Sequence, residues 1–422
     1  MRIAIIAPGS RGDIQPYIAL GKGLQDAGQG VLVVTNQEFE PLVRSYGLDC
    51  RPIAIDVQDA FQEQGTRAAM ESGKVLASFV KLAHIARRAT RMLAEIGLEV
   101  CKDVDGILSG FAGLLIGYSL AEKLGIPLIQ AYNVPMTPTS AFPGALVSPP
   151  PFALTGIGNR LSHRVSRQVV WQAARFAGAE ARKEVLGLPP ASFFGPFGSE
   201  LLKRGPVFYG WSPQVIPKPS DWDDTIEVTG YWFLDEPVGW TPPAALDEFL
   251  QSGPPPVCIG FGSMSHRDPE ATMRLVLEAL RMTGQRAIVL SGWGCMRGSG
   301  LPGNVFVADS APHAWLFPRV AAVVHHGGAG TTAAGIRAGL PSIVIPFHGD
   351  QPFWARRVAE LGVGPAPIPR RRLSARGLAR ALEEAMTDND MRRRAAALGA
   401  RVRAEDGVGR TVEALGRFEM GS

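Results

Sequence analysis

Short apolar runs alternate with longer amphipathic patterns through the first third of the chain. The run at 2–7 is followed by a glycine-containing loop and by a helical pattern in which Tyr17, Leu20 and Leu24 share one face. Strands separated by helices are typical of a parallel sheet that is covered on both faces. The pattern therefore predicts strands at 2–7, 31–35, 106–109 and 127–131, and helices at 14–27, 75–98 and 114–124.

A second series of the same kind begins near residue 256. Asp268 is placed to cap a helix that has Pro269 at its first position. Two doubly wound halves therefore share one α/β chain, and ligands of such sheets bind beyond the carboxyl ends of the strands, here in a cleft between the halves. The strands of this second series are predicted at 256–261, 287–290, 305–308, 321–325 and 342–345.

Two proline-rich stretches interrupt the alternation. Residues 134–158 contain six prolines, too many for a regular helix or a central strand, and a loop of this length is usually functional or disordered. The later part of 211–243 is expected to link the halves. The predicted organisation is a Rossmann-like domain at 1–215, a linker at 216–242, a second Rossmann-like domain at 243–405, and a C-terminal helix at 406–422 that crosses back to the first.

The composition narrows the class of protein. Of 422 residues, 46% are apolar and 19% are charged, which excludes a largely disordered chain. A net charge of +4 is too weak to indicate a nucleic-acid binder. There is no apolar stretch of about 18 residues and no segment with the features of an export signal. The four cysteines lack the spacing of metal ligands, so a cytoplasmic protein with reduced thiols is expected.

The most specific local motif is HHGGAGTT at 325–332. It follows an apolar strand and opens a helix, so its glycines let the backbone approach a ligand and the helix N-terminus offers free N–H groups. The Thr331 hydroxyl can donate to the same anion. A P-loop would need a lysine after the glycines, and none is present. The motif predicts a lysine-free pyrophosphate site; the alternative is a tight turn whose glycines serve only packing.

This motif resembles the donor signature of inverting UDP- or dTDP-sugar glycosyltransferases with the two-Rossmann GT-B architecture. The opening loop looks like the bacterial antibiotic and sterol branches of that family, and several further segments are similar to sterol 3β-glucosyltransferases. Together they span nearly the whole chain in the expected order. The segments are GSRGDIQP at 9–16, NVPMTPT at 133–139, YWF at 231–233, GFGSM at 260–264, SGW at 291–293, PHAWLF at 312–317 and PFHGDQ at 346–351.

The resemblance implies a donor site in the second half. His326 and the N–H groups from Gly328 to Thr331 would hold the diphosphate, and Ser263 would touch the same phosphates. Asp350 and Gln351 would bind sugar hydroxyls, although Asp350 is also placed to cap the next helix. The full set of expected donor contacts is Ser10, Arg11, Gly12, Ser263, Trp293, Ala311, His313, His326, Gly328, Ala329, Gly330, Thr331, Asp350 and Gln351.

Two positions depart from the plant members of the family. The tryptophan on which those enzymes stack the nucleobase is absent from the segment 310–313, so base contacts would come from the backbone near Ala311 or from Trp293. The glutamate that holds their ribose is Ala334 in this chain. Both UDP and dTDP are therefore retained as candidate nucleotides.

Asp13 is the expected general base. The first loop has no histidine, and its only ionisable side chains are Arg11 and Asp13. By the resemblance, Asp13 would take the proton of an acceptor hydroxyl as the oxygen attacks the anomeric carbon in line, with inversion. The same residue sits where an N-cap of the helix at 14–27 belongs, and the helix N-terminus and Arg11 would favour its ionised form. The two roles are compatible.

No metal and no cofactor are expected. Charge on the departing diphosphate would be stabilised by a helix dipole and N–H donors instead of a cation. Two Asp-x-Asp strings, at 103–105 and 221–223, are interpreted as a turn and part of the linker, with metal binding as the alternative.

The acceptor site is predicted from apolar residues of the first half. Met136 and Phe142 in the proline-rich loop and Phe79 in the helix at 75–98 would wall a pocket for a lipophilic alcohol, with ordinary core packing as the alternative. The arginine runs at 370–372 and 392–394 are expected to be solvated faces, with weak peripheral contact to an anionic membrane as the alternative.

Other functions fit the sequence less well. The first loop reads Gly9-x-x-Gly12 where a nicotinamide dehydrogenase needs GxGxxG, and no lysine that could hold pyridoxal phosphate follows Lys218. A non-hydrolysing sugar-nucleotide epimerase would share the donor half, and a non-catalytic binding subunit would use Asp13 only as a cap. The leading hypothesis is transfer of a hexose to a hydroxyl of a sterol-like, polyketide-like or flavonoid-like acceptor, and glucose is the first candidate for the hexose.

Overall fold

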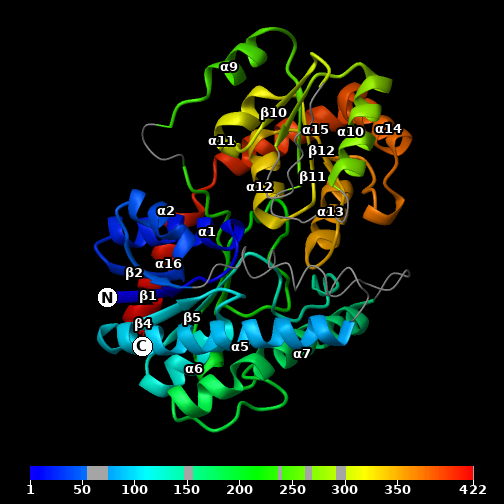
Figure 1. Cartoon of the computed structure of the whole chain (residues 1–422). Helices are drawn as coiled ribbons and strands as arrows, with labels where there is room; N and C mark the ends of the chain where they lie inside the picture. Colours follow the sequence, from blue (N-terminus) through cyan, green and yellow to red (C-terminus); the bar gives the residue numbers. More distant parts are fainter. Residues whose placement is uncertain (55–74, 147–154, 236–239, 262–268, 291–300, 422) are drawn as a thin grey trace.

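Two parallel sheets, one in each half of the chain, organise the molecule (Figure 1). The computed structural model describes residues 1–54, 75–146, 155–235, 240–261, 269–290 and 301–421. In spatial order, the first sheet consists of β3 (Asp49–Ile53), β2 (Gly30–Asn36), β1 (Arg2–Ile6), β4 (Gly106–Ser109), β5 (Leu128–Tyr132), β6 (Val207–Tyr209) and β7 (Ile226–Val228). The second consists of β10 (Val305–Ala308), β9 (Ala287–Leu290), β8 (Val257–Gly260), β11 (Ala322–His325) and β12 (Ser342–Val344).

Helices cover both faces of each sheet. The N-terminal half contains α1 (Arg11–Asp26), α2 (Glu40–Ser45), α5 (Val75–Val100), α6 (Leu114–Leu124), α7 (Gly156–Glu180) and α8 (Glu200–Arg204). The C-terminal half contains α9 (Ala244–Gln251), α10 (Pro269–Thr283), α11 (His313–Leu316), α12 (Ala329–Ala338), α13 (Gln351–Glu360), α14 (Ala375–Thr387) and α15 (Asn389–Arg403), and the chain ends in α16 (Gly407–Gly421). None of the described helices is long and apolar enough to cross a membrane.

Each sheet contains the reversal of strand order that defines a doubly wound fold. The reversal lies between β1 and β4 in the first sheet and between β8 and β11 in the second. All the strand pairs are parallel, so the carboxyl ends of the strands share one edge of each sheet. This confirms the predicted fold class of two Rossmann-like halves.

The first sheet is buried on both of its faces. Alternate residues of β1 belong to different cores, because Ile3 and Ile5 pack under α1 whereas Ala4 and Ile6 pack toward α5 and α6. Strands buried on both faces read as continuous apolar runs, which is why β1 and β4 could be predicted from the sequence.

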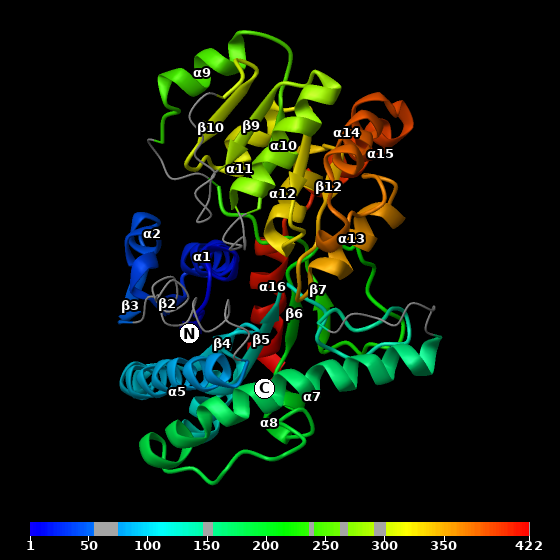
Figure 2. The same ribbon diagram turned by 45° about the vertical axis from the view of Figure 1, so that its right-hand side comes forward.

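The C-terminal helix α16 returns to the N-terminal half and packs on α1 (Figure 2). Its Thr411 hydroxyl accepts a hydrogen bond from Trp232 Nε1 at 2.8 Å. The chain therefore crosses between the halves twice, once after β7 and once before α16. The two crossings touch at Gly230 and Gly407, where a Cβ on Gly407 would lie 2.5 Å from the carbonyl carbon of Gly230.

The halves also contact each other through aromatic side chains. The rings of Trp211 and Trp354 lie 6.4 Å apart, and those of Phe142 and Phe353 lie 5.7 Å apart. Arg357 of α13 donates from Nε to the Val215 carbonyl at 2.6 Å. These contacts place the N-terminus of α13 against the first half, beside the cleft.

Several predicted boundaries differ from the structure. The predicted linker at 216–242 contains β7, a seventh strand of the first sheet, so the first half extends beyond residue 215. Only three residues form this strand, too few for a periodic pattern to appear. The helix predicted at 14–27 begins at Arg11 because Ser10 is its N-cap. The predicted loop at 134–158 ends where α7 begins at Gly156.

Candidate active site

A cleft of about 1470 Å³ lies between the halves. It is lined by the loops that follow β1 and β11, the two strands at which the strand order reverses, and by the segment 231–235 between the halves. Ligands of doubly wound sheets bind at such positions, because loops diverging to opposite faces leave a crevice there. The cleft therefore brings together the two sequence motifs that were expected to carry the chemistry.

Asp13 lies in the first turn of α1 and lines this cleft. The Ser10 backbone N–H and the Ser10 hydroxyl both donate to Asp13 Oδ2, each at 2.8 Å. Asp13 is thus the third residue of the helix and completes a capping box, whereas the N-cap itself is Ser10. The expectation that Asp13 occupies the N-cap position was wrong by three residues.

The Asp13 carboxyl is held by one oxygen. Both hydrogen bonds from Ser10 end on Oδ2, and among the described residues no hydrogen bond ends on Oδ1. Gly9 permits this arrangement, because its φ is +135° and a Cβ there would lie 2.7 Å from Asp13 Oδ2. The capping box therefore holds the carboxyl through Oδ2 and leaves Oδ1 without a protein partner among the described residues.

The surroundings of Asp13 raise its pKa. Water reaches the side chain, but protein from both halves encloses it, and this burial outweighs the lowering effect of the two bonds from Ser10. The sequence had indicated the opposite direction, on the ground that the helix N-terminus and Arg11 favour the ionised form. Desolvation is the larger effect, and a raised pKa makes a stronger base.

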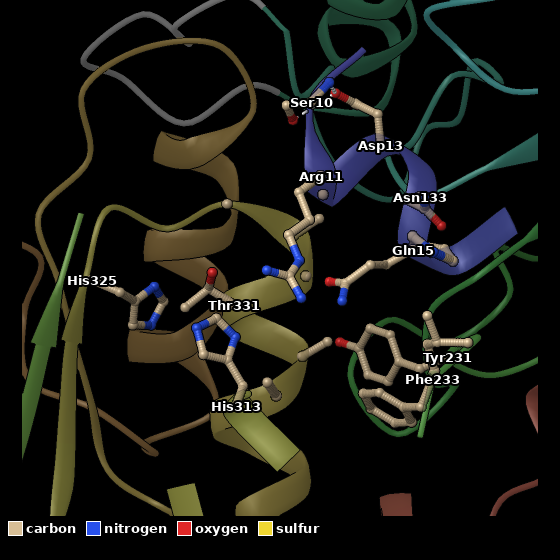
Figure 3. Close-up of a pocket in the computed structure, with 18 of the residues that line it drawn as sticks. Ser10, Arg11, Asp13, Gln15, Asn133, Tyr231, Phe233, His313, His325 and Thr331 are labelled. Atoms are coloured by element: carbon tan, nitrogen blue, oxygen red, sulfur yellow. Dashed lines mark hydrogen bonds between the residues drawn. The ribbon is translucent and has the colours of Figure 1, made fainter. Parts of the chain in front are cut away.

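Arg11 and Gln15 reach across the cleft on the other side of α1. They are four residues apart and therefore share one face of the helix, which is nearly opposite to the face of Asp13. Figure 3 shows both side chains extending toward His313 and Thr331 of the C-terminal half, while Asp13 turns back toward Ser10. Burial lowers the pKa of His313, and the positive charge of Arg11 lowers it further.

The glycines between β11 and α12 have different roles. Gly327 has a φ of +91°, and a Cβ there would lie 2.7 Å from Val344 Cγ1, so this glycine serves the turn. A Cβ on Gly328 would lie 2.5 Å from His326 Nε2, so this glycine makes room for the ring. A Cβ on Gly330 would meet no atom within 4 Å, and Gly330 lines the cleft. The packing explanation is correct for Gly327, and open space remains at Gly330.

The N-terminus of α12 points its unpaired backbone N–H groups at this open space. Gly328 is the N-cap, and residues 328–331 all line the cleft. The first N–H groups of a helix have no partner within the helix and carry its positive dipole end. An anion of the size of a diphosphate would satisfy them.

We call the open N-terminus of α12, residues 328–331, the anion cradle. The histidines beside this cradle are neutral at pH 7. Burial lowers the pKa of both His313 and His326 to about 4, with a further lowering from Arg11 on His313 and from His348 on His326. The Nδ1 atom of His326 is buried and has no hydrogen-bond partner among the described residues. These rings therefore act as neutral hydrogen-bonding groups, and the positive charge near the cradle comes from Arg11.

Asp350 stands at the N-terminus of α13, on the C-terminal side of the cleft. It occupies the N-cap position but makes no side-chain capping bond; its Oδ2 accepts from Trp354 Nε1 at 2.9 Å. Burial raises the pKa of Asp350 to about 6, and the negative charge of Asp13 adds to the rise. The two carboxyls thus approach the same space from opposite halves.

Gln351 is more constrained than expected for a sugar-binding residue. Its side chain is buried, and its Oε1 accepts from the backbone N–H groups of Phe347 and His348 at 2.8 and 3.2 Å. That oxygen is therefore committed to shaping the loop that follows β12. Gln351 lines the cleft next to Asp350.

The remaining predicted donor contacts fall into two groups, those that line the cleft and those outside the described residues. Ser10, Arg11, Gly12, Ala311 and His313 all line the cleft. Ser263 and Trp293 lie outside the described residues, so their predicted contacts stay predictions.

Two of the three predicted acceptor residues, Met136 and Phe142, do not line the cleft. Met136 is 2% exposed in the core of the first half, and its backbone N–H donates to the Tyr209 hydroxyl. Phe142 packs against the rings of Trp222 and Phe353. These two predictions were wrong because an apolar loop residue has the same sequence signature in a core as in a pocket. The side chain of Phe79 lies outside the described part of the chain.

Other apolar residues, of the first half and of the segment between the halves, line the cleft instead. Leu146 from the proline-rich loop, Phe111 after β4, and Tyr231 and Phe233 between the halves form its apolar wall. Arg337 of α12 lines the cleft, lies 4.4 Å from the centre of the Phe233 ring, and pairs with Asp235 at 3.3 Å. Gln15 also lines the cleft, and its spacing of four residues from Arg11 is a sequence signal that could have identified it.

The two Asp-x-Asp strings already have protein partners. Asp105 accepts from the Arg2 backbone N–H at 2.7 Å. Asp221 accepts from Thr139, Ser140 and Arg160. Neither string lines the cleft, and among the described residues no three His, Cys, Asp or Glu side chains are arranged to hold a metal ion.

Two family models match the chain. The glycosyltransferase family 28 N-terminal domain matches residues 3–143, and the erythromycin biosynthesis protein CIII-like C-terminal domain matches residues 289–412. The first match covers the loop of Asp13 and the second covers the glycine cradle. The two motifs that face each other across the cleft thus fall in regions that glycosyltransferases share.

Curated relatives agree with these models. The chain is 36% identical to the sterol 3-beta-glucosyltransferase UGT80B1 of Arabidopsis thaliana, over 99% of this chain and 68% of that protein. It is 38% identical to the sterol 3-beta-glucosyltransferase of Neosartorya fischeri, over 99% of this chain but 29% of the fungal protein. These relatives are plant and fungal proteins, so they do not support placing the chain in a bacterial branch.

Solved structures share the fold across the whole chain. The glycotransferase of kitacinnamycin has a TM-score of 0.72 at 18% identity and covers 99% of this chain. The glycosyltransferase VinC in complex with dTDP has a TM-score of 0.64 at 18% identity and covers 100% of this chain. At this identity the likeness shows that the fold is shared. Taken with the family models and the curated relatives, they show that the chain belongs to the GT-B glycosyltransferase family that includes the sterol 3-beta-glucosyltransferases.

Proposed function

We propose that the protein transfers a hexose from a UDP- or dTDP-sugar to the hydroxyl of a sterol-type alcohol, with inversion at the anomeric carbon. Glucose is the first candidate for the hexose. The observation that carries this proposal is the position of Asp13 in the same cleft as the open helix N-terminus of α12. A base on one side and an anion cradle on the other leave room between them for the sugar. The sterol-type acceptor is taken from the curated relatives at 36–38% identity.

In this proposal Asp13 Oδ1 accepts the proton of the acceptor hydroxyl. The freed oxygen forms its bond to the anomeric carbon while the bond from that carbon to the diphosphate oxygen breaks. The Ser10 bonds to Oδ2 orient the carboxyl, and the raised pKa of Asp13 strengthens the base. Asp350, which approaches from the opposite half, is the proposed acceptor of hydrogen bonds from sugar hydroxyls.

The departing diphosphate carries new negative charge away from the sugar. The N–H groups at the start of α12 and the Arg11 guanidinium are the groups proposed to stabilise it. The N–H groups belong to the backbone of α12 and are fixed before the reaction starts, so they need little reorganisation when the charge develops. We therefore propose that transfer proceeds without a metal ion.

Replacement of Asp13 by Asn tests the base. An amide keeps an oxygen that can accept from Ser10, so the fold and the affinity for UDP or dTDP are expected to stay the same. Turnover is expected to fall by about 10²–10⁴-fold, the usual contribution of a general base. Calorimetric titration with the nucleotide and product formation by mass spectrometry measure the two quantities; a variant with unchanged turnover contradicts the proposal.

Further measurements test the stereochemistry, the metal independence and the substrates of the proposed transfer. The anomeric configuration of the product, read by NMR, is expected to be opposite to that of the donor, and retention would rule out single displacement. Activity after dialysis against EDTA is expected to be unchanged, and strict dependence on an added cation would contradict the role given to Arg11 and α12. A panel of UDP- and dTDP-sugars against sterols and other lipophilic alcohols identifies the substrates.

A sugar-nucleotide epimerase makes a different prediction. It would convert the UDP-sugar without any alcohol present. Incubating the protein with donor alone and analysing the sugar nucleotide by chromatography separates the two functions, because a transferase leaves it unchanged.

A further inference from the structure

Helix α7 presents apolar side chains to solvent and polar ones to the protein. Ile157, Leu161, Val165 and Val169 follow one another at every fourth position and are exposed, Ile157 at 86%. On the opposite side, Asn159, His163 and Ser166 are buried. A helix on the surface of a soluble protein normally turns its apolar face to the core, so this arrangement is inverted. A contiguous exposed apolar patch of this kind marks an interaction surface.

Three phenylalanines extend the apolar stripe. The side chains of Gln168 and Gln172 both donate to the Phe193 carbonyl, at 2.9 and 2.6 Å, and so fix the loop 192–194 beside α7. Phe194 is 78% exposed, and its ring lies 5.1 Å from that of Phe193. Phe176, one turn before the end of α7, is also exposed. We call this set the α7 surface: Ile157, Leu161, Val165, Val169, Phe176, Phe193 and Phe194.

Arginines surround the α7 surface. Arg87 lies 5.3 Å from the centre of the Phe176 ring, and Arg175 lies 5.7 Å from that of Phe193. Arg88 and Arg164 are exposed nearby on α5 and α7. In the part of the chain that the structure describes, no ion pair involves any of these four arginines. The surface therefore combines apolar side chains with uncompensated positive charge.

The acidic groups at the two ends of α7 are already paired. Asp221 pairs with Arg160 at 2.9 Å, near the start of the helix. Glu180 and Glu184 pair with Arg91 at 2.9 and 3.0 Å, near its end. A second copy of the chain on this surface would bring like charges together. An anionic partner matches it instead.

We propose that the α7 surface docks on an anionic lipid bilayer, with α7 lying in the interface parallel to the membrane plane. Its apolar stripe would enter the boundary between headgroups and acyl chains, and the arginines would contact the lipid phosphates and carboxylates. From Ile157 to Phe176 the helix rises by roughly 28 Å at about 1.5 Å per residue, which is enough to lie along a surface. The charge comes from arginines around α7, and not from the runs at 370–372 and 392–394 in the other half.

The buried side of α7 leads to the cleft. Asn159 Nδ2 donates to the Ser140 carbonyl at 2.9 Å, and the Gly144 backbone N–H donates to the Ser162 hydroxyl at 2.8 Å. Leu146, a later residue of the same loop, lines the cleft. Docking on lipid through α7 would therefore place this wall of the cleft near the membrane in which a lipophilic acceptor is dissolved. This last step rests on the proposed function, whereas the docking itself does not.

Vesicle co-sedimentation of the full chain tests the proposal. The probes are vesicles of phosphatidylcholine alone and of phosphatidylcholine mixed with phosphatidylserine. The wild type is expected to prefer the phosphatidylserine vesicles. A stripe variant, Val165→Gln with Val169→Gln, and a charge variant, Arg88→Gln with Arg164→Gln, are each expected to lower the partition coefficient roughly tenfold. Arg371→Gln with Arg372→Gln is the matched control, because it removes the same charge from the donor half, and it is expected to bind like the wild type.

Several results would overturn the proposal. These are a wild type that does not sediment with phosphatidylserine vesicles, variants that sediment like the wild type, and a control that loses binding as they do. A dimer that the stripe variant converts to a monomer would assign the α7 surface to a second copy instead. Thermal unfolding of each variant, with activity on a detergent-dispersed alcohol, shows that folding and the cleft are intact. Vesicle binding by a protein that transfers no sugar would refute the proposed function and support the docking surface.

Discussion

The two oxygens of the Asp13 carboxyl have different surroundings. Oδ2 accepts both hydrogen bonds from Ser10, as in many helix caps, while among the described residues no hydrogen bond ends on Oδ1. One oxygen of this carboxyl therefore closes the helix, and the other is the atom to which the proposed mechanism gives the role of base. Its raised pKa also has a consequence for activity. The rate constant kcat/KM is expected to fall as the pH drops through the pKa of Asp13, since only the ionised carboxyl can accept a proton.

Asp350 gives a prediction about stability. Its pKa is about 6 in the folded protein and 3.8 ordinarily, so the folded state binds the proton more tightly than the unfolded state. Stability is therefore lost as the pH rises from about 4 to about 6, and the loss is complete above pH 6. Asp350→Asn removes the charge and is expected to raise the free energy of unfolding by about 1–3 kcal/mol at pH 7.5, with little change at pH 3.5.

The Asp221→Asn variant is the control for the Asp350→Asn variant, because its free energy of unfolding at pH 7.5 is expected to change in the opposite direction. Burial raises the pKa of Asp221, but hydrogen bonds from Thr139, Ser140 and Arg160 outweigh this effect and hold the pKa below its usual range. Its charge stabilises the fold above the ordinary pKa, so the Asn variant should be less stable than the wild type at pH 7.5. Urea unfolding monitored by tryptophan fluorescence measures both variants. An Asp350→Asn protein that is less stable than the wild type at pH 7.5 would contradict the assignment.

Two helix N-termini, those of α1 and α12, face one cleft from opposite halves. The first is closed by its own capping box, whereas the second keeps its N–H groups open. The difference follows from sequence: α1 has Ser10 as its N-cap and Asp13 at its third position, which bond to each other, whereas the N-cap of α12 is Gly328, which has no side chain, and α12 has no side-chain capping bond. A helix end without a cap is available to a ligand.

Gly330→Ala tests the open helix end. The added methyl group would project into free space where the diphosphate is proposed to bind, so the affinity for UDP or dTDP is expected to fall about tenfold or more. Stability should hold or rise by about 0.5–1 kcal/mol, because alanine favours the helix. Gly416→Ala in α16 is the matched control, as its Cβ would also meet no atom within 4 Å, but it lies away from the cleft. Unchanged nucleotide affinity in Gly330→Ala would place the phosphates elsewhere.

At the scale of the whole molecule, α16 connects the end of the chain to the helix that carries Asp13. A Cβ on Gly23 of α1 would lie 2.2 Å from Val408 Cγ1, so the two helices approach as closely as glycine allows. Gly23→Ala is expected to push α16 away and to destabilise the fold by about 1–3 kcal/mol, as overpacked cores do. The double variant Gly23→Ala with Val408→Ala should recover part of that loss in urea unfolding. A stable Gly23→Ala protein would show that this contact is not tight in solution.

The sequence pattern was sufficient where local rules decide the structure. Continuous apolar runs located β4, β9 and β10, because strands buried on both faces contain little else. It was insufficient where the environment decides. Met136 was placed in a pocket and lies in the core, and the pKa of Asp13 moves in the direction set by the enclosing halves, which no local motif records. The exposed apolar stripe of α7 was missed for the same reason, since periodicity alone does not tell which side faces water.

The contact between Gly230 and Gly407 bears on how substrates come and go. The segments before and after it join the halves, so a rotation of one half about this contact would leave the two segments together. Displacement in such a rotation grows with distance from the axis. The far rim of the cleft would then travel furthest, and the largest passage for an incoming or outgoing molecule would open on the side away from these two glycines.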